Sequence, residues 1–442
     1  YRGHTGEFGV FKGEIDEIRI YGKTLLPLEI TKIAAVEQPP KPEPELLAEY
    51  TIQNAKGVRE IKNELRLLRI QWLEKMMPLS EIMVMEDMPE KRKAFAYNRG
   101  DYVQPMYEVE MNTPEVLPEF SKDYPKNRLG LAKWLFSKDN PLTARVAVNR
   151  YWQMIFGEGL VSTPNDFGLQ GSRPSHPGLL DYLAVEFIAN DWDIKWLIKK
   201  LVMSYTYQQS SNTNSDLQNK DPNNRLLARG PSYRMQAEMI RDNALAASGL
   251  LKKAKGGESV KPYQPEGLWI EKSSFSHALL NYEPDKGDSL YRRSLYTFIR
   301  RTSPNPSMTI FDAPTREVCV VKRENTSTPL QALVLLNDPQ FVEISRIIAE
   351  RIQAEGGDSI NDQIQYAFRL ATGRSADQKE LELLMSLYDE QLAHYSANVS
   401  AANELISVGE FRKANHLDVP STAALSVVAS TIINHNESYM LR

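Results

Sequence analysis

The clearest chemical signal in this sequence is a group of four arginines within ten positions, between residues 292 and 301, with tyrosines beside them. Arginine is the side chain best shaped to bind a carboxylate, sulfate or phosphate through two parallel hydrogen bonds. Aromatic rings next to such planar donors suit sugars, including sugars that carry a negative charge. We therefore predict a substrate-binding set formed by Tyr263, Trp269, Arg292, Arg293, Tyr296, Arg300, Arg301 and Arg316.

Carboxylates near these arginines are the candidates for proton transfer. Asp312 and Glu317, close to proline and arginine in the sequence, are candidates for a carboxylate pair of the kind that hydrolyses glycosides. A third candidate, Glu238, lies where its pKa would be set by neighbouring arginines. Spacings of four, three and four residues put it on one face of a predicted helix, together with three other charged residues: Arg234, Arg241 and Asp242.

His176 is the last candidate for proton transfer, because it lies in a tight loop framed by glycine and proline and is suited to act as an acid, a base or a ligand. A structural interpretation stays open for every candidate. His176 would then cap a helix, the charged helix face would balance its own charge, and the arginines would bind buried carboxylates and loop carbonyls.

The single cysteine, Cys319, lies between two valines, which predicts a buried and inert thiol.

The spacing of apolar residues predicts a mainly α protein, in which a large helical domain carries long irregular loops. A helix begins near Ala55. Residues 81–85 read as a buried strand, and residues 86–125 as an irregular, extended arm. Further helices are predicted from residue 127 onward and over 142–156, 179–188, 194–207, 232–251, 329–336, 339–354, 361–371, 376–394 and 421–434.

Composition excludes several classes of protein. The chain has 442 residues, of which 42% are apolar and 25% charged, and its net charge of −4 gives no support to a nucleic-acid binder. No apolar run is long enough to cross a membrane. One cysteine excludes, within this chain, an internal disulfide, a cysteine-based zinc site and covalent attachment of haem c. The common phosphate-loop, dinucleotide, metalloprotease and serine-hydrolase motifs do not occur.

The first thirty residues predict the end of a β domain. Residues 13–21 alternate between apolar and polar side chains as a strand does, and an isolated strand is not stable in water. We therefore expect the chain to be a fragment of a longer protein. Residues 13–21, with the Leu25-Leu26-Pro27-Leu28-Glu29-Ile30 run, resemble the closing strand and exit helix of laminin-G-like, concanavalin-type lectin domains.

Four segments follow from these patterns. We expect the remnant of a laminin-G-like β-sandwich over residues 1–34 and a stiff, proline-rich linker over 35–48. A helix and the extended arm would occupy 49–125, and the mainly helical domain 126–442.

Longer strings in the second half carry a second resemblance. They are Asn127-Arg128-Leu129-Gly130-Leu131-Ala132-Lys133-Trp134-Leu135, Asn149-Arg150-Tyr151-Trp152, Pro174-Ser175-His176-Pro177, Leu290-Tyr291-Arg292-Arg293-Ser294-Leu295-Tyr296 and Thr328-Pro329-Leu330-Gln331-Ala332-Leu333-Val334-Leu335-Leu336-Asn337-Asp338-Pro339. Over roughly residues 80–442 the chain resembles the C-terminal uncharacterised domain of large planctomycete-type cytochrome c proteins.

That resemblance implies an exported protein of several domains, located in the periplasm or at the cell surface. It implies no cofactor within this chain and a haem c upstream of Tyr1. Because genes of this kind often lie near sulfatases and polysaccharide-degrading enzymes, it also implies a connection to glycans. It carries over no catalytic residue.

Two hypotheses from different classes follow, and the sequence does not decide whether the chain is catalytic. In the first, the chain acts on or binds polysaccharide and passes electrons to the upstream haem. In the second, it is a non-catalytic scaffold that docks the haem domain, the lectin domain and a partner subunit. An open cleft of arginines and aromatic rings would favour the first, and arginines paired with buried carboxylates would favour the second. A third, weaker hypothesis is a calcium-dependent glycan-binding module. No nucleic acid is expected as a partner, and no transmembrane segment is expected in the chain.

Overall fold

The computed structural model describes residues 55–79, 82–88, 90–272 and 281–441, together with a few isolated positions before residue 55. The chain divides into two compact units, Tyr1–Phe95 and Ala96–Arg442. The lectin-like remnant predicted over 1–34 and the linker predicted over 35–48 lie almost wholly outside the described residues.

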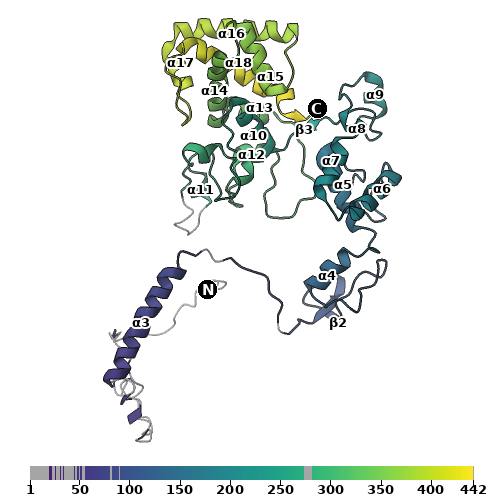
Figure 1. The fold of residues 1–442 in the computed structure, drawn as a ribbon, viewed down its shortest axis with the longest axis vertical. Helices are drawn as coiled ribbons and strands as arrows, with labels where there is room; N and C mark the ends of the chain where they lie inside the picture. The colour runs from purple at the N-terminus through teal and green to yellow at the C-terminus, as the bar shows by residue number, and fades with distance from the viewer. Residues whose placement is uncertain are drawn as a thin grey trace. The chain divides into compact units, whose positions relative to one another are not determined.

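The described part of the first unit contains the long helix α3 (Lys56–Met76), as the apolar spacing predicts (Figure 1). Its apolar side chains recur every three or four residues, yet they stay exposed within the described part of the unit. Ile61 is 66% exposed, Leu68 54% and Trp72 60%. A helix of this composition is normally stable only when another surface covers its apolar side.

The segment that follows α3 departs from the prediction. Residues 82–88 have no regular structure and are exposed, so a buried strand at 81–85 is wrong for its described part. The predicted irregular arm instead contains a small two-stranded sheet, formed by β1 (Ala94–Tyr97) and β2 (Pro105–Val109). A short 3₁₀ turn, η1 (Asn98–Gly100), follows β1.

A group of short helices builds a first core in the second unit. Asn127 caps α4 (Arg128–Leu135) by accepting hydrogen bonds from the backbone N–H groups of the first turn. In α5, α6 and α7, apolar side chains such as Val148, Leu183 and Leu197 meet in one buried cluster. The bounds of the remaining helices in this group are α5 (Thr143–Phe156), α6 (Pro177–Ala189), α7 (Ile194–Val202), α8 (Tyr205–Gln208) and α9 (Ser215–Lys220).

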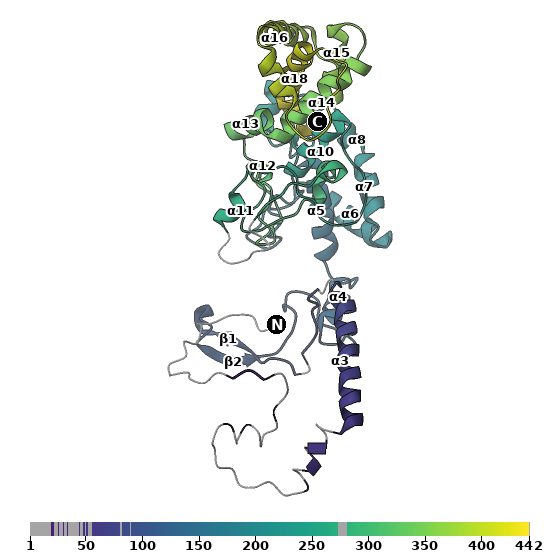
Figure 2. The same cartoon turned by 90° about the vertical axis from the view of Figure 1, so that its left-hand side faces the viewer.

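The larger core surrounds α18 (Val419–Asn434), which packs against five other helices (Figures 1 and 2). Most of its side chains are alanine, serine, valine or isoleucine, and these small or branched residues let neighbouring helices approach closely. The neighbouring helices are α13 (Pro329–Asn337), α14 (Pro339–Glu355), α15 (Ile360–Thr372), α16 (Gln378–Ala397) and α17 (Val399–Ile406).

The helix α10 (Ala237–Ser248) joins this core to the loops that carry the candidate residues. The sequence predicts a helix from residue 232, but the structure first forms β3 (Tyr233–Arg234), which pairs antiparallel with β4 (Met440–Leu441). In the described residues between α10 and α13, the loops hold only short elements. These are α11 (Leu268–Glu271), η3 (Gly287–Tyr291), η4 (Ser294–Tyr296) and α12 (Pro306–Ile310), and a last 3₁₀ turn, η5 (Asn436–Ser438), precedes β4.

The fold class is therefore mainly α, as predicted, with about 52% helix and 4% strand. None of the helices in the described part of the chain is both long and apolar enough to cross a membrane.

Candidate functional site

The organising residue of the candidate region is Arg241, which is buried in α10. Its guanidinium donates to the side chain of Gln340 at 2.5 Å, to the carbonyl of Leu290 at 2.7 Å and to that of Arg292 at 2.9 Å. Burial lowers the pKa of Arg241 to about 10. Because these bonds join α10 to η3 and η4, Arg241 fixes the backbone of the arginine-rich stretch rather than facing solvent.

Two of the predicted substrate-binding arginines bind the protein's own carbonyls. Arg292 donates to the carbonyls of Glu258 and Gly256, and its guanidinium lies 4.0 Å from the centre of the Tyr296 ring. Arg300 donates to the carbonyl of Trp269 at 3.1 Å and lies 5.0 Å from that residue's ring centre. Both side chains therefore hold loops in place.

The predicted aromatic residues are also engaged inside the protein. Trp269 is 2% exposed and packs edge-on against Tyr282, with ring centres 5.0 Å apart. The hydroxyl of Tyr263 accepts a hydrogen bond from the backbone N–H of Glu410 at 2.8 Å, and that of Tyr296 accepts one from the N–H of Gly256. No open stacking platform for a sugar follows from these contacts.

The carboxylate of Glu238, in the first turn of α10, is paired with arginines from a distant loop. Arg323 binds it through both of its terminal nitrogens, at 2.6 and 3.1 Å. Arg316 approaches the same carboxylate at 3.8 Å, and its side chain is half exposed. Burial by itself raises the pKa of Glu238, but the hydrogen bonds and charge of Arg323 outweigh burial and hold the pKa below its usual range.

A second ion pair lies at the start of the same loop. Arg234 of β3 donates to Asp312 at 2.5 Å, and the backbone N–H and hydroxyl of Thr326 donate to the same carboxylate at 2.9 Å. Burial raises the pKa of Asp312, but the bonds from Thr326 and Arg234 outweigh it and lower the pKa. We call Arg234, Glu238, Asp312, Arg316 and Arg323 the α10 cluster.

The two carboxylates of the predicted pair, Asp312 and Glu317, lie in different ion pairs. Asp312 belongs to the α10 cluster, whereas Glu317 lies 3.6 Å from Arg301 in an exposed ion pair. Asp312 and Arg316 both have left-handed backbones, with φ of 60° and 65°, which is uncommon outside glycine and occurs where surrounding contacts impose it. Cys319, on the same loop, is exposed, so the prediction of a buried thiol is wrong.

A family model for PSD1, a protein of unknown function (DUF1553), matches residues 127–388, which is more than half of the chain. The chain belongs to the PSD1 family. The matched region begins at Asn127, the capping residue of α4, and contains all of the candidate residues from His176 to Glu317. This confirms the resemblance to an uncharacterised domain, and the cytochrome context and the lectin-like segment stay predictions. No curated protein and no solved structure matches the chain.

Two further candidates in the PSD1 region, His176 and Arg293, also lie outside the α10 cluster. His176 precedes α6, with Pro177 in the first turn as predicted, and its Nδ1 atom lies 3.1 Å from the hydroxyl of Ser175. Arg293 is half-buried, and its guanidinium makes no hydrogen bond or ion pair within the described residues. Neither residue contacts the carboxylates of the α10 cluster.

Sequence reasoning on the PSD1 region missed Arg323, which binds Glu238, and Thr326, which donates to Asp312. Both residues lie in a loop without periodic spacing, so the sequence did not indicate which residues they contact. The arginines and carboxylates around them were recognised as candidates. Within the described residues, no group of histidine, cysteine, aspartate or glutamate is arranged to hold a metal ion.

Proposed function

We propose that this chain is a non-catalytic scaffold, which docks the haem and lectin domains of an exported, cytochrome-linked protein and a partner subunit. The observation that carries the proposal is the way in which the arginines of the candidate region are used, both predicted ones and one that was not predicted, Arg323. Arg292 and Arg300 bind loop carbonyls, and Arg323 binds Glu238 through two nitrogens. A substrate would have to break these internal bonds, and leaving a buried polar group unpaired costs about 1–3 kcal/mol.

The exposed apolar side of α3 supports the docking role. Val58, Ile61, Leu65, Leu68 and Trp72 follow alternating spacings of three and four residues, which is the pattern of a helix that packs along another helix. Large exposed apolar surfaces mark sites of association. In this proposal, the surface formed by these five residues receives the upstream part of the same protein, outside the cytoplasm.

The second candidate function is the binding or redox-coupled processing of polysaccharide. The half-exposed side chains of Arg316 and Arg301 favour it, because they are the arginines of the predicted set that remain accessible. In this reading the upstream haem c would accept the electrons, and this chain would contribute binding rather than a catalytic pair.

One experiment separates the two functions. The protein with everything upstream of Tyr1 attached is incubated with sulfated and neutral polysaccharides and with electron acceptors, and the products are analysed by mass spectrometry. The scaffold predicts unchanged glycans. A gain of water would indicate hydrolysis, a loss of two hydrogens would indicate oxidation, and either would overturn the scaffold.

A companion measurement tests the docking surface directly. In the full-length protein, hydrogen exchange of α3 is expected to be slow, and Leu65→Glu together with Leu68→Glu is expected to make it fast. The matched control is Asn63→Glu with Gln71→Glu, which adds the same charge at positions outside the apolar spacing. Fast exchange of α3 in the unmodified protein would contradict the proposal.

A further inference from the structure

The α10 cluster carries an excess of positive charge. Three arginines, Arg234, Arg316 and Arg323, face two carboxylates, Glu238 and Asp312. Arg323 and Asp312 are bound closely by their partners, so the surplus charge resides mainly on Arg316. Its nitrogen lies 3.8 Å from Glu238, which is longer than a hydrogen bond, and half of its side chain is exposed.

Arg234 has an unused donor at the inner side of the same cluster. Its side chain is 9% exposed. The Nε atom donates to Asn325 at 3.0 Å and Nη2 donates to Asp312, whereas Nη1 is buried and has no acceptor. Buried guanidinium groups nearly always find an acceptor, so an orphaned nitrogen of this kind indicates an unfilled position for a ligand atom or a water.

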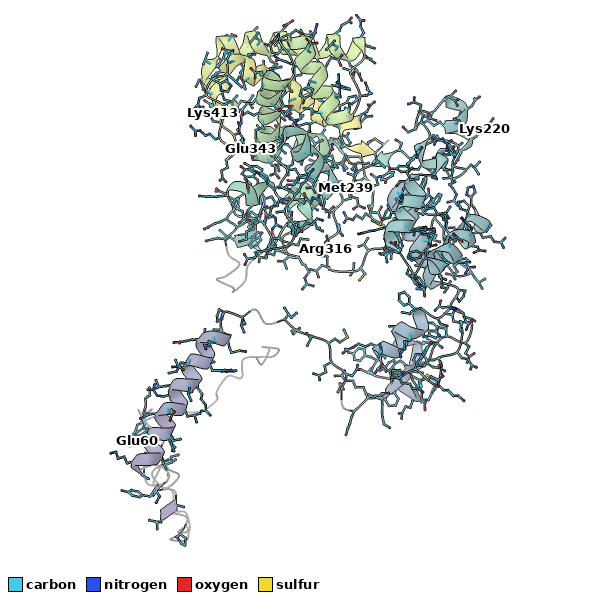
Figure 3. All side chains as sticks on the ribbon, viewed as in Figure 1. Glu60, Lys220, Met239, Arg316, Glu343 and Lys413 are labelled. Carbon is cyan, nitrogen blue, oxygen red and sulfur yellow. The ribbon has the colours of Figure 1, made fainter. Side chains whose placement is uncertain are left out.

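The surrounding backbone adds further donors. Glu238 lies in the first turn of α10, and Gln236, which precedes that helix, makes no capping bond with its side chain. The positive end of a helix favours an anion. Along the loop, the backbone N–H groups from Val318 to Asn325 make no hydrogen bond among the described residues. Figure 3 shows Arg316 on this extended loop and Met239 on the neighbouring α10.

We infer that the α10 cluster is a binding site for an oxyanion, namely a sulfate or a carboxylate, in which Arg316 is the outer donor and Arg234 the inner donor. The exposed Arg316 gives up its long contact with Glu238 and binds two oxygens of the anion. One of these oxygens, or a third oxygen in the case of sulfate, supplies the acceptor that Nη1 of Arg234 lacks. Planar guanidinium groups suit such two-point contacts better than lysine does.

This site does not depend on the scaffold proposal. A scaffold with an oxyanion site would bind the charged group of a partner or of a glycan without altering it. The same chemistry is found in a free inorganic ion and in a sulfated or carboxylated sugar, so the test includes both sources.

The test measures binding of inorganic sulfate and of a sulfated monosaccharide to the whole chain by calorimetry, at constant ionic strength set with chloride. Arg316→Ala is expected to weaken sulfate binding by about tenfold or more, as expected when one charge-assisted contact is lost. The matched control is Arg369→Ala, which removes the same charge from an exposed arginine of α15 and should leave binding unchanged.

A second variant tests the inference independently of Arg316→Ala. Glu238→Gln removes the carboxylate that competes for Arg316, so sulfate binding should become tighter, whereas a purely structural role predicts weaker binding or none. If the sulfated sugar competes with inorganic sulfate, the oxyanion that the site binds is assigned to a glycan. If only the inorganic ion binds, the oxyanion is assigned to a free anion. Binding that is equal in the unmodified chain and in Arg316→Ala, or absent for both probes, would overturn the inference.

Discussion

Arg374 and Arg234 both hold carboxylates that come from distant parts of the chain, but the two clusters differ in how completely their donors are used. Arg374 binds Glu437 at 2.6 Å and Glu380 at 2.7 Å, and all of its side-chain nitrogens are occupied. Arg234 leaves one nitrogen without an acceptor. The first cluster has two carboxylates for one arginine, and the α10 cluster has two carboxylates for three.

The difference shows how to distinguish a structural cluster, which only holds elements together, from a binding site when both are built from arginine and carboxylate. A cluster in which every donor is satisfied and the charge is slightly negative can do little except hold elements together. A cluster with an unused buried donor and surplus positive charge retains capacity for a ligand. The following predictions test that distinction.

The largest effect is expected for Arg374→Ala. The change leaves the carboxylates of Glu380 and Glu437 close together without the arginine between them. We expect the free energy of unfolding to fall by about 2–3 kcal/mol, a value that already allows for the partial exposure of Arg374. Urea denaturation measures it. Arg374→Lys, which keeps the charge but not the paired geometry, should lose less. A loss below about 0.5 kcal/mol would mean that the cluster around Arg374 does not hold these elements together.

An intermediate effect is expected for Glu238→Gln. Arg323 keeps one neutral acceptor in place of a charged one, so the free energy of unfolding should fall by about 1–2 kcal/mol. The change should be smaller than that of Arg374→Ala, because the α10 cluster is less tightly closed. A larger loss would show that the α10 cluster carries more of the stability, and would weaken the comparison.

The pH dependence of stability should report on the cluster around Arg374. Hydrogen bonds from Arg374 lower the pKa of Glu380 to about 2. A carboxyl with a lowered pKa in the folded protein contributes stability that is present above its ordinary pKa, near 4.5, and is lost as the pH falls toward 2. We therefore expect Glu380→Gln to flatten the decline in unfolding free energy between these two pH values. An unchanged slope in this window would contradict the assignment.

The smallest effect is expected for Arg301→Ala. Its pair with Glu317 is long, at 3.6 Å, and both side chains are more than half exposed. Pairs of this kind contribute less than about 0.5 kcal/mol to the free energy of unfolding. Thermal denaturation at low and at high salt should show almost no difference between the variant and the unmodified chain. A clear loss would mean that Arg301 has a partner beyond Glu317.

The helices were largely predictable from the sequence because their information is local. Asp193 accepts hydrogen bonds from the first turn of α7 and Pro177 begins α6, so both helix starts rest on the chemistry of nearby residues. The start of α10 was not predictable, because β3 forms only through pairing with β4 at the far end of the chain.

The candidate site was only partly predictable, for a related reason. Glu238 was recognised as a carboxylate set among arginines, but its main partner, Arg323, lies 85 residues away in a loop without periodicity. Apolar neighbours of Cys319 suggested burial, whereas the loop that carries it is exposed. Which charged residues meet across such a distance is decided by how the helices pack, and local spacing does not contain that information.

The pairing of β3 with β4 has a consequence for how the protein is made. Tyr233 faces Leu441 and Arg234 faces Met440, so the segment that carries the inner donor of the α10 cluster receives its backbone partner from residues that follow α18, far along the chain. Contacts between positions so far apart in sequence form late in folding. Chains interrupted before β4 would therefore lack a completed cluster, and the cluster becomes a marker that the chain has been translated and folded through β4.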